Sequence, residues 1–157
     1  MEHVEINQTM KLSEHFSLGE LTKTSVKTKD GNIPSHVAIE NLKRVCEWLE
    51  HLRAQYNLLY SDGSHPIIIN SGYRSEAVNK KVGGSPTSNH LTGCAADIKV
   101  FGIEEALRYA VILLNYADLT REKFDELLIE RSPRGTYWLH FAVRPKENRR
   151  KVAFLRE

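Results

Sequence analysis

A histidine and an aspartate stand seven positions apart in the segment SNHLTGCAAD, residues 88–97. Asp97 lies in an apolar run that is typical of a mostly buried strand. A buried carboxylate is costly unless it is paired, hydrogen-bonded or bound to a metal ion, and the nearby His90 favours the metal. His140, in the segment WLHFA, is a candidate third ligand. Two histidines and one carboxylate leave a fourth tetrahedral position open, which is typical of a catalytic zinc site.

Four segments of the chain carry a recognisable pattern. They are FSLGEL (16–21), SGYRS (71–75), VGGS (82–85) and Ser-x-His-x-x-Gly-x-Ala-x-Asp (88–97), which Trp-x-His follows about forty residues later. Together they resemble the zinc D-Ala-D-Ala carboxypeptidase family of murein peptidases, and most of all its short, single-domain branch from phages and bacteria. Each segment is a weak match alone, but four in order at plausible spacings make a strong one that covers nearly the whole chain.

The resemblance implies an α+β fold, in which a small antiparallel sheet carries helices on one face and a zinc groove on the other, as in hedgehog-type domains. It implies a zinc peptidase that hydrolyses peptidoglycan stem peptides at D-Ala-containing bonds, as a D,D-carboxypeptidase or a murein endopeptidase. The implied cofactor is Zn²⁺, held by His90, Asp97 and His140. We expect a single peptidase domain over residues 1–157, with residues 1–15 as an N-terminal extension.

Arg74 is a candidate catalytic and substrate-binding residue, because it follows a short apolar strand in a tight Ser-Gly-Tyr turn. A guanidinium there can hold a substrate carboxylate through two hydrogen bonds or stabilise the oxyanion formed during attack. The alternative is an arginine that ties loops together. Ser88, Tyr73 and Trp138 are further candidate substrate-binding residues, although either aromatic ring could equally serve in packing.

The general base is harder to assign. Many relatives carry Glu-x-x-His at the last ligand, whereas Tyr137 occupies the glutamate position here. A zinc hydrolase still needs a carboxylate or an equivalent group close to the reacting water. Glu126 and Glu130 share one face of a strand expected at 124–130. We predict Glu130 as the base, since the branch that the chain resembles has a glutamate at that place, and Glu126 is the alternative.

Apolar periodicity predicts the elements that position these residues. Amphipathic helices are expected from Ser35 to about Tyr56 and over 103–117, and a short helix from Ser75 to Val82. Residues 1–35 are expected to be loop-like. Strands are expected at 66–70, in the interior of the sheet, and at 94–100, 124–130 and 137–143, with a turn at 132–135 joining the last two. Periodicity alone fits a helix at 124–130 as well, and the resemblance favours the strand.

Strand alternation places the candidate ligands on one face of the sheet. Asp97 lies opposite the apolar positions 96, 98 and 100, and His140 lies opposite positions 139, 141 and 143, which are expected in the core. His90 is an odd number of residues from Asp97, so a single straight strand could not present both side chains to the groove. We therefore expect the chain to turn at Gly93.

The bulk composition is that of a globular domain without a nucleic-acid partner. Hydrophobic residues make up 41% and charged residues 27% of the 157, and a net charge of +2 is too small to indicate nucleic-acid binding. We expect a monomer, with Cys46 and Cys94 as small core residues rather than a disulfide. A catalytic thiol at Cys94 is the alternative. The basic residues at 144–151 are expected to form a solvated tail, with a wall-binding patch as the alternative.

The N-terminal residues lack a basic segment followed by an apolar one, and no apolar run could span a membrane. We therefore expect no signal peptide, a chain that is cytoplasmic as synthesised, and action on the cell wall after release by lysis or another export route. That route fits a phage endolysin. The runner-up function is a non-catalytic, zinc-stabilised hedgehog-like binding module, which Tyr137 in place of the glutamate favours.

Overall fold

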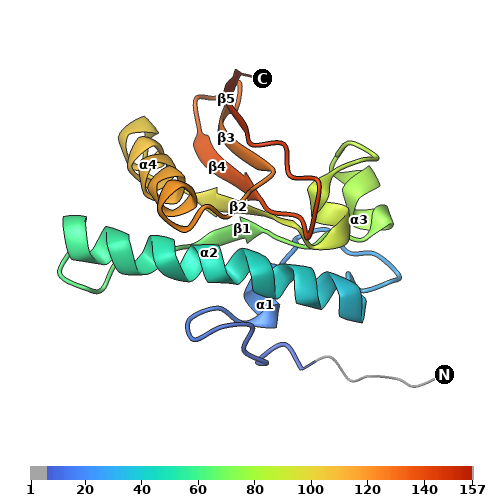
Figure 1. The fold of residues 1–157 in the computed structure, drawn as a ribbon. Helices are drawn as coiled ribbons and strands as arrows, with labels where there is room; N and C mark the ends of the chain where they lie inside the picture. Colours follow the sequence, from blue (N-terminus) through green and yellow to red (C-terminus); the bar gives the residue numbers. More distant parts are fainter. Residues whose placement is uncertain (1–6, 157) are drawn as a thin grey trace.

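The computed structural model describes residues 7–156 (Figure 1). Its elements, in chain order, are α1 (Leu18–Leu21), α2 (His36–Tyr60), β1 (Ile69–Ser71), α3 (Glu76–Lys81), the 3₁₀ helix η1 (Asn89–Thr92), β2 (Ala95–Lys99), α4 (Ile103–Thr120), β3 (Glu126–Arg131), β4 (Tyr137–Ala142) and β5 (Lys151–Arg156). The chain combines its helices with one five-stranded sheet, so the predicted α+β class is confirmed.

The sheet has the strand order β1-β2-β4-β3-β5. Its first four strands pair antiparallel, as expected, whereas β5 joins β3 in parallel, so the sheet as a whole is mixed. The strand predicted at 66–70 was wrongly placed in the interior of the sheet, since β1 lies at an edge. Ile67 and Ile69 are nevertheless buried. Helix α1 packs beside β1, where the Tyr73 N–H donates to the Leu21 carbonyl at 2.7 Å.

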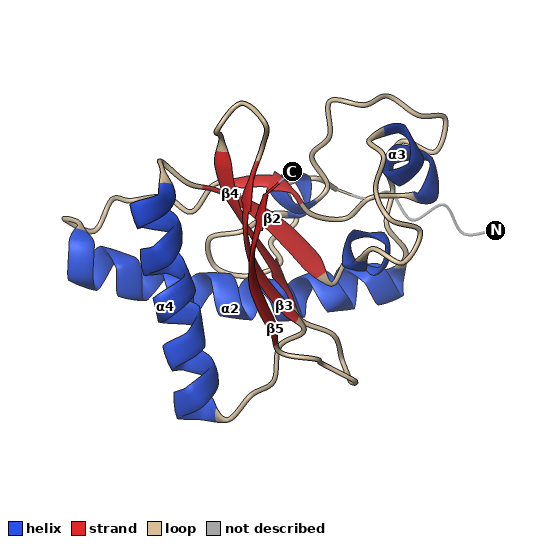
Figure 2. Ribbon diagram, turned by 90° about the horizontal axis from the view of Figure 1, so that it is seen from above, coloured by secondary structure: helices blue, strands red, loops and turns tan. Residues whose placement is uncertain are grey.

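The two long helices cover one face of the sheet. Figure 2 shows α4 on one side of the strands and α3 on the other. The predicted N-cap of α2 is confirmed, since the Ser35 hydroxyl accepts a hydrogen bond from the Ala38 N–H. The helix runs to Tyr60, four residues beyond the predicted end. Trp48 packs edge-on against Phe124 and at a tilt against Phe141, and this contact joins α2 to the sheet.

Strand alternation was predicted correctly on β2 and β4. The apolar positions 96, 98 and 100 on the first strand, and 139, 141 and 143 on the second, lie in the core. On β3 the core residues are Leu127 and Ile129, so Glu126, Leu128 and Glu130 face the opposite side. That opposite side is the groove face of the sheet. The ambiguous segment is therefore a strand, as the resemblance favoured.

Two segments that were predicted to lack regular structure contain it. Ser17 and Glu20 form a reciprocal capping box that starts α1, a signal present in the sequence. The basic segment at 144–151 is mostly exposed, as expected, but it is not a tail, because its last residue begins β5. Residues 1–6 of the expected N-terminal extension lie outside the described residues, whereas Leu12 packs in the core.

Both cysteines are buried and unpaired, as predicted. Burial raises the pKa of the Cys46 thiol to about 12 and also raises the pKa of Cys94, so neither carries an activated thiolate. Within residues 7–156, no helix combines the length and the apolar composition needed to cross a bilayer.

Candidate metal centre and its groove

His90, Asp97 and His140 converge on one point of the groove face, where one donor atom from each lies within 4.8 Å of the other two. His90 Nε2 is 3.3 Å from Asp97 Oδ2, and His140 Nδ1 is 2.9 Å from Asp97 Oδ1. Three vertices of a tetrahedron around a zinc ion, with bonds of about 2.0–2.1 Å, are separated by about 3.3 Å. The donor types and these two spacings therefore suit a zinc ion.

The local backbone explains how His90 reaches this point. Ser88 caps η1, and Gly93 ends it with φ at +75°, in the left-handed region. A Cβ on Gly93 would lie 2.5 Å from the Ala38 carbonyl oxygen, so the turn against α2 requires glycine. The Gly72 carbonyl accepts from His90 Nδ1 at 2.6 Å, which leaves Nε2 to face Asp97. The predicted turn at Gly93 is confirmed.

Asp97 and His140 are direct cross-strand neighbours in the β2–β4 pair. Burial alone would raise the pKa of Asp97, but His90 and His140 beside the carboxylate hold it far below its usual range. Burial alone would lower the pKa of His140, but hydrogen bonds with Asp97 and Glu126 raise it to about 10. The three side chains thus form one tightly coupled electrostatic unit.

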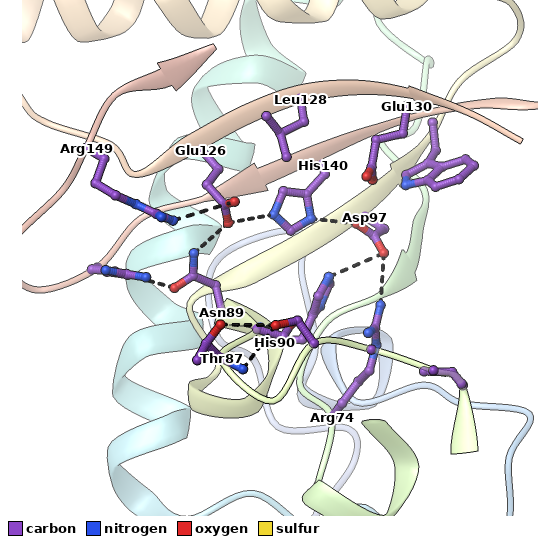
Figure 3. Close-up of a pocket in the computed structure, with 17 residues that line it drawn as sticks. Arg74, Thr87, Asn89, His90, Asp97, Glu126, Leu128, Glu130, His140 and Arg149 are labelled. Atoms are coloured by element: carbon purple, nitrogen blue, oxygen red, sulfur yellow. Dashed lines mark hydrogen bonds and ion pairs between the residues drawn. The ribbon is translucent and has the colours of Figure 1, made fainter. Parts of the chain in front are cut away.

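The centre lies in a groove of about 640 Å³. Residues of the α3–η1 loop line one side, and Arg144 and Arg149 of the C-terminal segment line another. Figure 3 shows Glu126 and Glu130 to either side of Leu128, above the His140 ring, with Arg74 below Asp97. The lining is mostly polar and charged, which suits a polar substrate more than an apolar one.

Arg74 is fixed by three hydrogen bonds. Its Nε donates to the Ser71 hydroxyl at 3.1 Å, one terminal nitrogen donates to Asn79 Oδ1 at 3.2 Å, and the other donates to Asp97 Oδ2 at 3.3 Å. Gly84 lies directly over this arrangement, since a Cβ there would lie 2.0 Å from Asn79 Oδ1. The arginine is therefore held against a candidate metal ligand while it still lines the groove.

The two candidate bases have different surroundings. Glu126 Oε1 is 3.1 Å from His140 Nε2 and accepts from Asn89 Nδ2 at 2.6 Å. Glu130 lies on the other side of the His140 ring, and its carboxylate points toward the side where Asp97 lies (Figure 3). Tyr137 packs against the core, and its ring is 6.4 Å from that of Phe154, so this position faces away from the groove.

The remaining predicted site residues separate into two groups. Ser88 and Trp138 line the groove. Tyr73 is not among its lining residues, because its ring packs against the core beside α1. Its backbone instead holds a turn in place, since the Tyr73 carbonyl accepts from Asn32 Nδ2 at 3.1 Å.

A charged network that was not predicted from the sequence lies behind the candidate metal centre. Asp125 has a fully buried side chain and accepts from Arg149 Nε at 3.0 Å, from an Arg149 terminal nitrogen at 2.8 Å and from Asn89 Nδ2 at 2.8 Å. Burial alone would raise the pKa of Asp125, but the hydrogen bonds from Arg149 and Asn89 lower it to about 2. The sequence signal that could have indicated this network is Asp125 itself, a charged residue at the start of an apolar strand.

Comparison with known sequences agrees with this geometry. Residues 14–125 match the peptidase M15 family, which is well over half of the chain. The chain belongs to the peptidase M15 family. The match includes Arg74, His90 and Asp97 and ends before Glu126, Glu130 and His140, so the placement of these last three rests on the fold.

A zinc D-Ala-D-Ala carboxypeptidase from Streptomyces albus G is 30% identical over 84 residues. The aligned part covers 54% of this chain and 31% of that relative, so the chain spans less than a third of the relative's length. Zn²⁺ is the cofactor that membership of this family and the His-Asp-His cluster imply.

Proposed function

We propose that this chain is a zinc peptidase that hydrolyses peptidoglycan stem peptides at D-Ala-containing bonds. The observation that carries the proposal is the convergence of His90, Asp97 and His140 in an open polar groove that also contains carboxylates and an arginine. A purely structural zinc site would fill all four positions with protein ligands. Membership of a peptidase family and the name of the Streptomyces relative support the same reaction.

The proposal gives the groove residues distinct roles. A bound zinc ion would supply Lewis-acid chemistry, by polarising the scissile carbonyl and lowering the pKa of a water molecule. Glu130 accepts the proton of the attacking water and returns it to the leaving amine. Arg74 holds a substrate carboxylate or the developing oxyanion, with Ser88 and Trp138 as further substrate contacts. A guanidinium has five N–H groups, so its three bonds to the protein leave capacity for substrate.

Glu130 is favoured over Glu126 as the base by their surroundings. The Glu126 carboxylate faces His140 Nε2 at 3.1 Å, whereas Asp97 lies on the Nδ1 side of the ring. Glu130 extends into the groove on the side of the ring where Asp97 lies (Figure 3). The non-catalytic binding module was suggested by Tyr137, but that position faces the core, and two other carboxylates line the groove. The absence of a carboxylate at 137 therefore does not favour the binding module.

The proposal extends to the domain organisation, the oligomeric state and the route to the cell wall. We propose that residues 1–157 act as one peptidase domain and as a monomer, on wall material reached after lysis or by another export route. The carboxypeptidase and endopeptidase forms of the reaction differ in what lies beyond the scissile bond. The groove volume of about 640 Å³ is compatible with either form.

Defined muropeptides test the reaction directly. The purified protein should release one D-alanine from a pentapeptide stem if it is a carboxypeptidase, or split a cross-linked dimer if it is an endopeptidase. Mass spectrometry distinguishes the products, and a chelator should abolish both reactions until zinc is restored. Zinc-loaded protein that binds these peptides without cleaving them would contradict the enzyme and support the binding module.

Two matched variants on one strand face test the base. Glu130→Gln keeps the shape of the side chain but cannot accept a proton, so turnover should fall by roughly a hundredfold or more while zinc stays bound. Glu126→Gln makes the same chemical change four residues earlier and should be mild by comparison. A larger loss in Glu126→Gln than in Glu130→Gln would reverse the two assignments.

A further inference from the structure

Glu126 occupies a particular place beside the metal centre. The two ring nitrogens of His140 face different carboxylates: Nδ1 faces Asp97 at 2.9 Å, and Nε2 faces Glu126 at 3.1 Å (Figure 3). The Nδ1 side of the ring faces the candidate ligand Asp97, and Glu126 lies on the opposite side. Glu126 therefore lies behind the ring as seen from the metal centre.

The position of Glu126 is fixed by a buried amide. Asn89 Nδ2 donates to Glu126 Oε1 at 2.6 Å and to Asp125 Oδ2 at 2.8 Å, and Asn89 Oδ1 accepts from Arg144 Nε at 2.8 Å. The Arg144 contact determines which end of the amide carries the oxygen, because a guanidinium only donates. Asn89 is buried, and its donors consequently point at the two carboxylates.

Asp125 connects this amide to the C-terminal segment. Its fully buried carboxylate also accepts from the Arg149 backbone N–H and side chain. The segment before β5 thus fixes Asp125 through Arg149. Asp125 and Arg144 in turn bind the two ends of the Asn89 amide, and that amide donates to Glu126. Each link is a hydrogen bond with a charged partner, the stronger class of hydrogen bond in proteins.

We infer that Glu126 is a positioning residue that fixes the tautomer and ring orientation of His140. An ionised carboxylate only accepts hydrogen bonds, so the Glu126 side requires a proton on Nε2 and leaves Nδ1 as the nitrogen for the metal ion. Metal-ligating histidines usually depend on such a partner, and its loss costs about 10- to 100-fold in metal affinity. The inference rests on the proposed ligand role of His140, but it does not require that the protein cleaves a peptide.

Zinc affinity tests the inference independently of hydrolysis. Glu126→Leu removes the acceptor and should weaken zinc binding by about 10- to 100-fold, measured by competition with a chromophoric chelator. Glu130→Leu is the matched control, because it makes the same exchange on the same face of β3 and also removes one negative charge. Glu126→Gln retains an oxygen that can accept from Nε2 and should recover most of the affinity.

The imidazole nitrogens provide a second readout that a merely structural role would not change. In ¹⁵N-histidine-labelled, zinc-loaded protein, the His140 signals, identified by their loss in His140→Ala, should show a protonated Nε2 and a metal-bound Nδ1. Glu126→Leu should exchange between tautomers or lose this pattern, and Glu126→Gln should keep it. Metal on Nε2 in the unmodified protein, or wild-type zinc affinity and spectra in Glu126→Leu, would overturn the inference. Failure to cleave muropeptides would instead overturn the proposed function and leave both readouts intact.

Discussion

The buried Asp125 carboxylate should make this protein sensitive to acid in a calculable way. Its pKa is about 2 in the folded chain, against 3.8 for an unperturbed aspartate. Because the folded value is the lower one, the carboxylate stabilises the fold above pH 4 and loses that contribution as the pH falls toward 2. The difference between the folded and unperturbed pKa values corresponds to about 2.4 kcal/mol of folding stability at neutral pH. About half of this contribution remains at pH 3.

The perturbation that tests this value is Asp125→Asn. The amide cannot be ionised, and its NH₂ group would meet donors from Arg149 or Asn89 at sites where the carboxylate accepts. We expect the free energy of unfolding at pH 6 to fall by about 2–4 kcal/mol, which covers the lost charge and the imperfectly paired amide. Urea unfolding followed by circular dichroism measures this difference.

The pH dependence separates the charge of Asp125 from simple packing. The difference in unfolding free energy between wild type and Asp125→Asn should shrink by about 1.1 kcal/mol between pH 6 and pH 3, because Asp125 takes up a proton in the unfolded wild type over this range while it stays mostly ionised in the folded one, and the variant has no carboxylate there. A difference that stays constant over this range would refute the reasoning. Asp118→Asn is the control: Asp118 forms an exposed ion pair with Arg150, whose loss should cost less than about 1 kcal/mol.

Zinc analysis should find one ion per chain, with less in His140→Ala because one of three donors is gone; equal zinc in both would contradict the ligand assignment. Arg74→Lys should lower kcat/KM by roughly tenfold or more, or about 1.4 kcal/mol, with zinc content unchanged, since lysine lacks the planar fork. Unchanged kinetics would assign Arg74 to structure alone. Gly84→Ala should also lower kcat/KM, because its Cβ would lie 2.0 Å from Asn79 Oδ1 and 3.0 Å from an Arg74 terminal nitrogen. Gly83→Ala, strained at φ +73° but with open space around its Cβ, should reduce stability without this effect, and equal kinetic losses in the two variants would contradict the steric argument.

The elements predicted correctly are those whose apolar residues recur with a helical or strand period. Two amphipathic helices, the capped turn before α3 and the alternation on β2 and β4 follow from spacing alone, because each is decided by residues a few positions apart. The edge position of β1 and the parallel pairing of β5 depend on contacts between distant segments, and no local period encodes them. The basic residues before β5 resembled a solvated tail because their partner, Asp125, lies about twenty residues earlier.

The candidate site divides in the same way. His90, Asp97 and His140 could be found because a metal needs particular residue types, and strand parity then places two of them on one face. Asn89 is an ordinary polar residue whose role becomes visible only when Glu126 and Asp125 are seen on either side of its amide. Types and spacing can identify ligands, but they cannot identify the groups that orient them.

The three candidate ligands are oriented in the same way. Each is held at a second polar atom by another segment of the chain: the histidine of η1 by the Gly72 carbonyl, the aspartate of β2 by Arg74, and His140 by Glu126. The turn at 72–74 and strand β3 therefore determine where the donor atoms meet, so little side-chain freedom remains to be lost when an ion binds. A binding module could use such rigidity only for stability. Beside an open groove with a second carboxylate, the same rigidity favours catalysis, because a preorganised centre needs no rearrangement as charge develops on the substrate.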